Sequence, residues 1–217
     1  AGLSIDNAIV ELDSYEVPVM DGSAGPFTRM ILKAGIREQR AERHFFVLKK
    51  PIELEQDGKF VGVYPDTTFK ITCNIKFEHH LIREQSYSIE VLDHIFEREI
   101  SSARTFGFLH EVEYMKLYGL ARGGSLDNAV VIDKSSILNA EGLRYQDEFV
   151  RHKLLDCIGD FSLLGMRTIG LIVTNKSGHA FNHAFLEKFF SKKTCWETQT
   201  LPFHPDPAHK TLKSLAI

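Results

Sequence analysis

The feature that most restricts the fold is a succession of four strand-length segments between His44 and Phe77. Their sequences are FFVLKK, PIELEQ, FVGVYP and FKITCNIKF, with a turn at Asp57-Gly58 before the third. Segments of this length, rich in β-branched and aromatic residues and separated by turn residues, are typical of β-strands. The pattern predicts a β-meander, in which each strand pairs with the next one along the chain.

Segments with helical features alternate with strand-length segments along the rest of the chain. Apolar spacing and capping residues predict helices at about 26–33, 88–100, 111–118, 147–164 and 180–190. Further strands are expected at 7–12, 103–108, 128–133 and 169–174. The combination predicts an α+β fold, a two-layer sandwich of a mainly antiparallel sheet with helices packed on one face.

The same features divide the chain into three parts. Residues 1–40 are expected to be the C-terminal remnant of a first α+β domain with a charged linker, because Ala1-Gly2 resembles the end of a helix that starts upstream. Residues 41–200 form a second α+β domain, and 201–217 a tail. Strand, helix and strand over about 105–133 predict a small βαβ insert in the second domain.

Composition restricts the partners and the compartment. The 26 basic residues are balanced by 29 acidic ones, giving a net charge of −3 without a basic block, so no nucleic-acid partner is expected. The cysteines Cys73, Cys157 and Cys195 are scattered, which is typical of free thiols in a reducing compartment. No apolar run is long enough for a transmembrane segment and no secretory signal is visible. These features predict a cytoplasmic protein.

Candidate metal ligands lie in the helix predicted over 147–164. His152 and Asp156 are four residues apart, so both side chains leave one face about one turn apart. An imidazole and a carboxylate are typical ligands of a hydrolytic zinc ion (Zn²⁺), which needs three protein ligands and an open position for water. A surface ion pair or a capped core histidine would have the same spacing, and none of the other histidines is a convincing third ligand.

Two turns carry further candidate residues. His179 follows Ser177-Gly178 at a strand-to-helix turn, where it could act as a general acid tuned by a carboxylate such as Asp160, or simply cap the helix. Gly124 and Ser125 belong to a Gly-Gly-Ser turn that could cradle a phosphate, although a lone Gly-Gly is more often only a turn.

Five segments considered together indicate a family. They are MDGSAGPF at 20–27, SARTFGF at 102–108, GGSLD at 123–127, DEFVRHKLLD at 147–156 and KSGHA at 176–180. In order and separation they closely resemble the UDP-3-O-acyl-N-acetylglucosamine deacetylases, the zinc amidases that commit bacteria to lipid A synthesis. The resemblance covers residues 1 to about 200. It implies hydrolysis of the acetamide of an acylated UDP-amino-sugar with release of acetate.

The resemblance also implies a role for each matching residue. His152 and Asp156 match two zinc ligands. His179 matches the histidine that stabilises the oxyanion and protonates the leaving amine, Asp160 the carboxylate that orients it, and Thr105 a hydroxyl beside the oxyanion. The implied substrate contacts are Phe106 to the sugar, Lys153, Lys59 toward the diphosphate, and Gly124 and Ser125 at the mouth of an acyl-chain passage formed by the βαβ insert.

One part of the family pattern is absent from this sequence. The family has a further zinc histidine and a glutamate general base in an N-terminal segment that precedes residues such as Ala1-Gly2-Leu3. We therefore expect that segment as a partner, and weak zinc binding and little turnover from these 217 residues alone. Two other hypotheses are a catalytically inactive relative and an RNA-binding domain on the same scaffold. The latter would need a basic, aromatic-studded face, against which the net charge argues.

Overall fold

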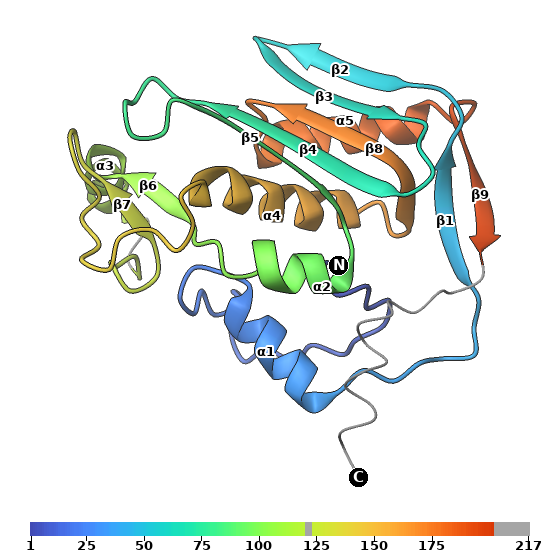
Figure 1. Cartoon of the computed structure of the whole chain (residues 1–217), viewed down its shortest axis with the longest axis horizontal. Coiled ribbons are helices and arrows are strands. Elements are labelled where there is room, and N and C mark those ends of the chain that lie inside the picture. The colour runs from blue at the N-terminus through green and yellow to red at the C-terminus, as the bar shows by residue number, and fades with distance from the viewer. Residues whose placement is uncertain (120–122, 202–217) are drawn as a thin grey trace.

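The computed structural model describes residues 1–119 and 123–201. Seven strands form one mixed sheet, and two helices, α4 (Glu148–Ser162) and α5 (His179–Ser191), cover one of its faces (Figure 1). The predicted two-layer α+β sandwich is therefore confirmed. The strands are β1 (Arg43–Leu48), β2 (Ile52–Gln56), β3 (Lys59–Tyr64), β4 (Phe69–Lys76), β5 (Glu84–Glu90), β8 (Arg167–Asn175) and β9 (Trp196–Leu201).

Strand β8 organises the sheet because it pairs along both of its edges. Its first residues pair in parallel with β1, and from Gly170 onward it lies between parallel β4 and antiparallel β3. Antiparallel β9, β2 and β5 extend the sheet from β1, β3 and β4. The predicted meander is therefore wrong: β2 and β3 form a hairpin, whereas β1 and β4 both pair with the distant β8. Local turn residues cannot specify this long-range pairing.

Gly170 lies where β8 changes neighbours. A Cβ atom at this position would be 2.8 Å from the carbonyl oxygen of Tyr64 and 3.2 Å from Cδ2 of Leu48. We expect Gly170→Ala to lower the free energy of unfolding by about 1–3 kcal/mol, because the backbone of β3 would have to move. Urea unfolding measures this change.

Gly159 provides the matched control for that substitution. It is exposed in α4, and a Cβ atom there would meet nothing within 4 Å. Gly159→Ala is therefore expected to stabilise the protein by about 0.5–1 kcal/mol through helix propensity alone. Similar effects of the two substitutions would contradict the steric explanation for Gly170.

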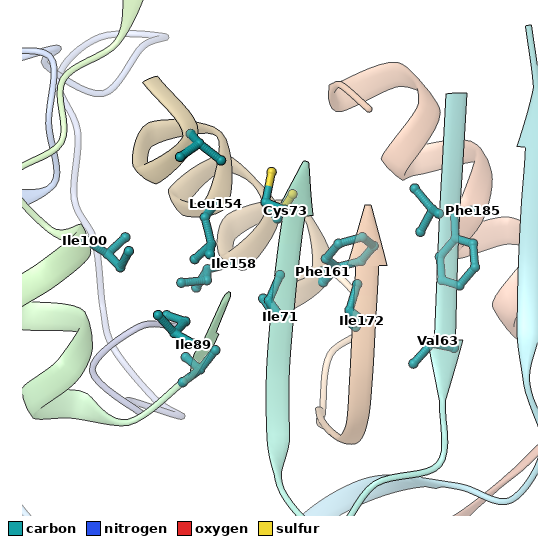
Figure 2. Close-up of a cluster of buried hydrophobic side chains, with 14 of the residues drawn as sticks. Val63, Ile71, Cys73, Ile89, Ile100, Leu154, Ile158, Phe161, Ile172 and Phe185 are labelled. Atoms are coloured by element: carbon teal, nitrogen blue, oxygen red, sulfur yellow. The ribbon is translucent and has the colours of Figure 1, made fainter. Parts of the chain in front are cut away.

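The hydrophobic core fills the space between the sheet and the two helices (Figure 2). Every second residue of β8 is buried, which is the alternation expected of a strand with one face on a core. The labelled core side chains of Figure 2 come from strands β3, β4, β5 and β8, from α4 and α5, and, for Ile100, from the π-helix at 96–100: Val63, Ile71, Cys73, Ile89, Ile172, Ile100, Leu154, Ile158, Phe161 and Phe185. This packing fixes the position of α4, so the side chains on the face of α4 next to its core-facing side are also held in place.

The helix predicted over 88–100 is wrong in its first part. Ser88 to Glu90 complete β5, and helical structure begins only with α2 (Asp93–Ile95), which continues as the π-helix η1 (Phe96–Ile100). Ile89 and Ile100 are both buried, so apolar spacing alone did not distinguish a strand residue from a helix residue. Strand β5 is polar in sequence because it pairs only with β4, at an edge of the sheet.

The two ends of the described chain also differ from expectation. The strand predicted at 7–12 is wrong: these residues form no strand and are exposed, with Ile9 at 93%. A strand needs a neighbouring edge to satisfy its backbone, and no described strand pairs with this segment. The sequence did not predict β9, which ends at Leu201, where the tail was expected to begin. The rest of the predicted tail, 202–217, lies outside the described residues.

The predicted insert and the end of the first helix are confirmed. The insert consists of β6 (Phe106–Phe108), α3 (Leu109–Leu117) and β7 (Val130–Ile132), with β6 and β7 parallel. Helix α1 (Gly25–Ala34) ends at Gly35, which has a φ of 86°. The three cysteines are free thiols. Within residues 1–119 and 123–201, no helix is both long and apolar enough to cross a membrane.

Candidate metal and acid–base site

Helix α4 carries the centre of the candidate site. His152 is buried, and its Nε2 lies 3.4 Å from Oδ1 of Asp156, one turn further along the helix. The Nζ of Lys153 donates a hydrogen bond of 2.8 Å to Oδ2 of the same carboxylate. Burial alone would lower the pKa of Lys153, but the attraction of Asp156 outweighs it and raises the pKa, so the lysine keeps its charge at neutral pH.

The orientation of His152 is set by the backbone of a segment that crosses α4. Its Nδ1 lies 3.0 Å from the carbonyl oxygen of Ala103. A carbonyl only accepts hydrogen bonds, so Nδ1 carries the proton and Nε2 of the neutral ring keeps a lone pair. In the neutral ring, this lone pair and Oδ1 of Asp156 are two acceptors 3.4 Å apart that face one another. A cation bound to both would stabilise this arrangement, and the donor types suit zinc.

These two donors come from α4 alone. Within the described ranges 1–119 and 123–201, no group of three or more His, Cys, Asp or Glu side chains is arranged to hold a metal ion. A hydrolytic zinc site has three protein ligands, so this part of the chain provides two of the expected three.

His179 and Asp160 form a second pair beside the first. His179 begins α5, and its Nδ1 lies 3.0 Å from both carboxylate oxygens of Asp160 on α4. Its Nε2 is 3.9 Å from Oδ2 of Asp156, and its side chain is 69% exposed. The ring is therefore fixed through Nδ1 while Nε2 faces the first pair from the solvent side.

Asn182 holds Asp160 in place, and the sequence did not single it out. It is 1% exposed, and its Nδ2 donates a hydrogen bond of 2.7 Å to Oδ2 of Asp160. Its Oδ1 accepts a hydrogen bond from Ser177. Asn182 follows His179 by three residues in a predicted helix, and this spacing places both side chains on one face. This spacing of three residues is the sequence signal that could have identified Asn182.

An open cleft of about 360 Å³ connects these groups. Its walls include Thr105, Phe106, His152, Lys153, Asp156 and His179, all of which had been singled out in the sequence. Further walls come from Phe77, Gly107, Phe108 and Glu111, which had not. The remaining predicted substrate contacts, Lys59, Gly124 and Ser125, are exposed and do not line this cleft.

This combination of groups is typical of one class of protein. A histidine and a carboxylate that can share a metal ion, a charged lysine and an accessible histidine–aspartate pair are residue types found in the active sites of metal-dependent hydrolases. His152, Lys153 and Asp156 lie in the middle of α4 and line one cleft together with His179, where a substrate could reach all four.

Comparison with known proteins identifies the family. The family model described as "LpxC: UDP-3-O-acyl N-acetylglycosamine deacetylase" matches residues 1–191, and the chain belongs to this family. It is 52% identical over 197 residues to the UDP-3-O-acyl-N-acetylglucosamine deacetylase of Myxococcus xanthus, covering 91% of this chain and 63% of that protein. The resemblance seen in the sequence is therefore confirmed.

Other relatives with the same name have similar coverage. The protein of Syntrophus aciditrophicus is 46% identical over 198 residues, which are 91% of this chain and 63% of the relative. That of Teredinibacter turnerae is 49% identical over 202 residues, 92% of this chain and 67% of the relative. The chain thus spans slightly less than two thirds of the length of the first two relatives.

Proposed function

We propose that this chain forms the larger part of a zinc-dependent deacetylase of lipid A biosynthesis. The reaction would hydrolyse the acetamide of UDP-3-O-acyl-N-acetylglucosamine and release acetate. The observation that carries the proposal is the cleft in which His152 and Asp156 lie beside His179, whose Nδ1 contacts Asp160. The names of the family and of the relatives support the choice of substrate. The free thiols support a reducing compartment, the cytoplasm.

The metal would be held through Nε2 of His152 and a carboxylate oxygen of Asp156. When bound there, zinc supplies Lewis-acid polarisation of the acetamide carbonyl and activation of a water molecule. Asp156 accepts a hydrogen bond from Lys153, and the Ala103 carbonyl keeps the His152 proton on Nδ1. These contacts support a site in which both donors are already oriented before the metal binds.

His179 would supply the proton for the leaving amine. Its Nδ1 proton is hydrogen-bonded to Asp160, so a proton on Nε2 is the one that can be transferred to the substrate. The Asp160 carboxylate accepts the hydrogen bond from Nδ1 of His179, and Asn182 donates to the same carboxylate and holds its orientation. The Thr105 hydroxyl, in the wall of the cleft, would donate to the oxyanion.

The remaining predicted residues would bind the substrate. Phe106 offers an aromatic surface to the sugar from the cleft wall, and Lys153 offers a positive charge close to it. Lys59 would meet the diphosphate. Gly124 and Ser125 would lie at the mouth of an acyl-chain passage in the βαβ insert.

The third zinc ligand and the general base would come from an amino-terminal segment. The greater length of the relatives supports this. We propose that residues 1–40 are the end of a first domain, with 41–200 as the second domain and 201–217 as a tail. Large exposed apolar side chains are frequent in residues 1–40: Ile9, Val10, Leu12, Tyr15, Val17, Val19, Met20, Met30 and Ile31. Apolar surface of this extent is typical of a contact with another protein segment.

Acetate release tests the proposal directly. The chain is joined to the amino-terminal segment of the Myxococcus xanthus relative, supplied with zinc, and given UDP-3-O-acyl-N-acetylglucosamine. We expect acetate release from the joined protein and little or none from the 217 residues alone. A folded, zinc-loaded joined protein without activity would instead support a catalytically inactive relative. RNA binding has no support from the net charge of −3, and retention of RNA on a filter at physiological salt would be unexpected.

A further inference from the structure

Arg104 and Glu148 form an ion pair in the core, behind the cleft. Their side chains are 2% and 0% exposed. One carboxylate oxygen of Glu148 accepts from Nε of Arg104 at 2.9 Å, and the other accepts from Nη2 at 3.2 Å and from the backbone N–H of Arg144 at 2.7 Å. The guanidinium also donates to Glu141 and to the carbonyl of Gly142. Both charges therefore have several hydrogen-bond partners.

Stability alone does not explain such a pair. Removing two charges from water is costly, and replacing a buried ion pair by apolar side chains of similar volume is often neutral or stabilising. The position of the pair in the fold suggests a different reason. Glu148 lies one turn before His152 on α4, and Arg104 directly follows Ala103, whose carbonyl orients His152.

A single peptide group connects Glu148 to His152. The N–H of the peptide between Ala103 and Arg104 donates a hydrogen bond of 2.9 Å to Oε1 of Glu148. The C=O of the same peptide accepts the hydrogen bond of 3.0 Å from Nδ1 of His152. Two side chains on one face of α4 are thus joined through one amide, which donates to the first and accepts from the second.

We propose that Glu148 is a positioning residue that acts on His152 through this peptide and strengthens it as a metal ligand. This inference rests on the proposed function, because it requires His152 to bind the metal. A carboxylate that accepts from an amide N–H polarises the amide, and the carbonyl oxygen becomes a better acceptor. A stronger acceptor on Nδ1–H fixes the ring tautomer and raises the basicity of Nε2. Arg104 holds the carboxylate in the orientation that this requires.

The same arrangement also fixes Thr105. Its N–H donates to the carbonyl of Gly22 at 2.8 Å, and its own carbonyl accepts from the N–H of Val130 at 2.8 Å. The segment 103–105 is therefore anchored at Glu148 on one side and at Gly22 and Val130 on the other. Movement of the Ala103–Arg104 peptide would displace the partner of His152 and the Thr105 hydroxyl together.

The test is Glu148→Gln in the joined protein that carries the amino-terminal segment of the Myxococcus xanthus relative. Glutamine keeps the size of the side chain and removes its charge. We expect the zinc dissociation constant, measured by competition with a chelator, to rise by about 10–100-fold, the usual effect of losing an outer partner of a metal ligand. In the metal-free protein, the NMR signal of the His152 Nδ1 proton should exchange with water faster than in the parent.

Glu141→Gln is the matched control. Glu141 contacts the same guanidinium, but its side chain is 59% exposed and it does not touch the Ala103–Arg104 peptide. Zinc affinity and the Nδ1 proton signal should stay as in the parent. If Glu148→Gln does not fold, the double variant Arg104→Met/Glu148→Leu, which removes both charges, replaces it, with the same expected loss of zinc affinity.

The outcomes separate this inference from the proposed function. Parental zinc affinity in folded Glu148→Gln, or in the folded double variant, would overturn the inference. An equal loss of affinity in Glu141→Gln would overturn it as well, since general weakening of the charge cluster would then be the cause. A parent protein that binds zinc but releases no acetate would overturn the proposed function, while the comparison of zinc affinities would still decide the role of Glu148.

Discussion

His179→Gln is expected to lower acetate release by the joined protein by about 10²–10⁴-fold with its zinc content unchanged. Asp160 fixes Nδ1 of His179 at 3.0 Å, so Nε2 is the atom that can deliver a proton into the cleft. Glutamine has a similar size but no titrating group. An amine is a poor leaving group without a proton, so the loss should appear in kcat at saturating substrate.

His183→Gln is the control for that experiment. His183 is exposed on α5, one turn beyond His179, and does not line the cleft. Its substitution should leave acetate release unchanged. Parental turnover in His179→Gln would show that the proton comes from another group, and the assignment of His179 as general acid would then be abandoned.

Local features of the fold were predictable because their causes are local. The apolar spacing of α4 and the alternation of β8 follow from the side-chain periods of helices and strands. The neighbours of each strand were not predictable in this way. Whether β4 pairs with β3 or with β8 is decided by which edges the whole core leaves free, and no turn residue near β4 carries that information.

The candidate site shows the same difference between local and long-range features. The approach of His152 and Asp156 follows from a spacing of four in one helix, and the sequence was sufficient for it. The contact of His179 with Asp160 depends on how α5 packs against α4, so the residues alone offered it only beside helix capping, and the family resemblance favoured it. Buried polar partners such as Asn182 and Glu148 were missed, because a polar residue in a helix gives no sign of being buried until its partner is known.

His152→Ala is expected to weaken zinc binding by more than the 10–100-fold typical of an outer partner, and to abolish acetate release with it. The substitution removes one of the two donors that α4 provides and leaves Asp156 as the other. It also removes the hydrogen-bond donor of the Ala103 carbonyl, which costs about 1–3 kcal/mol of stability if the carbonyl stays buried. Circular dichroism should therefore accompany the zinc titration.

His80→Ala is the control for zinc binding. His80 is exposed, stacks on His79, and does not line the cleft, so its loss should not change zinc affinity. Comparison with His179→Gln then separates two roles within one cleft. If His152 is a ligand and His179 an acid, His152→Ala loses both zinc and turnover, whereas His179→Gln loses turnover and keeps zinc. A folded His152→Ala protein with parental zinc affinity would mean that the metal binds elsewhere and that the facing acceptors on α4 have another purpose.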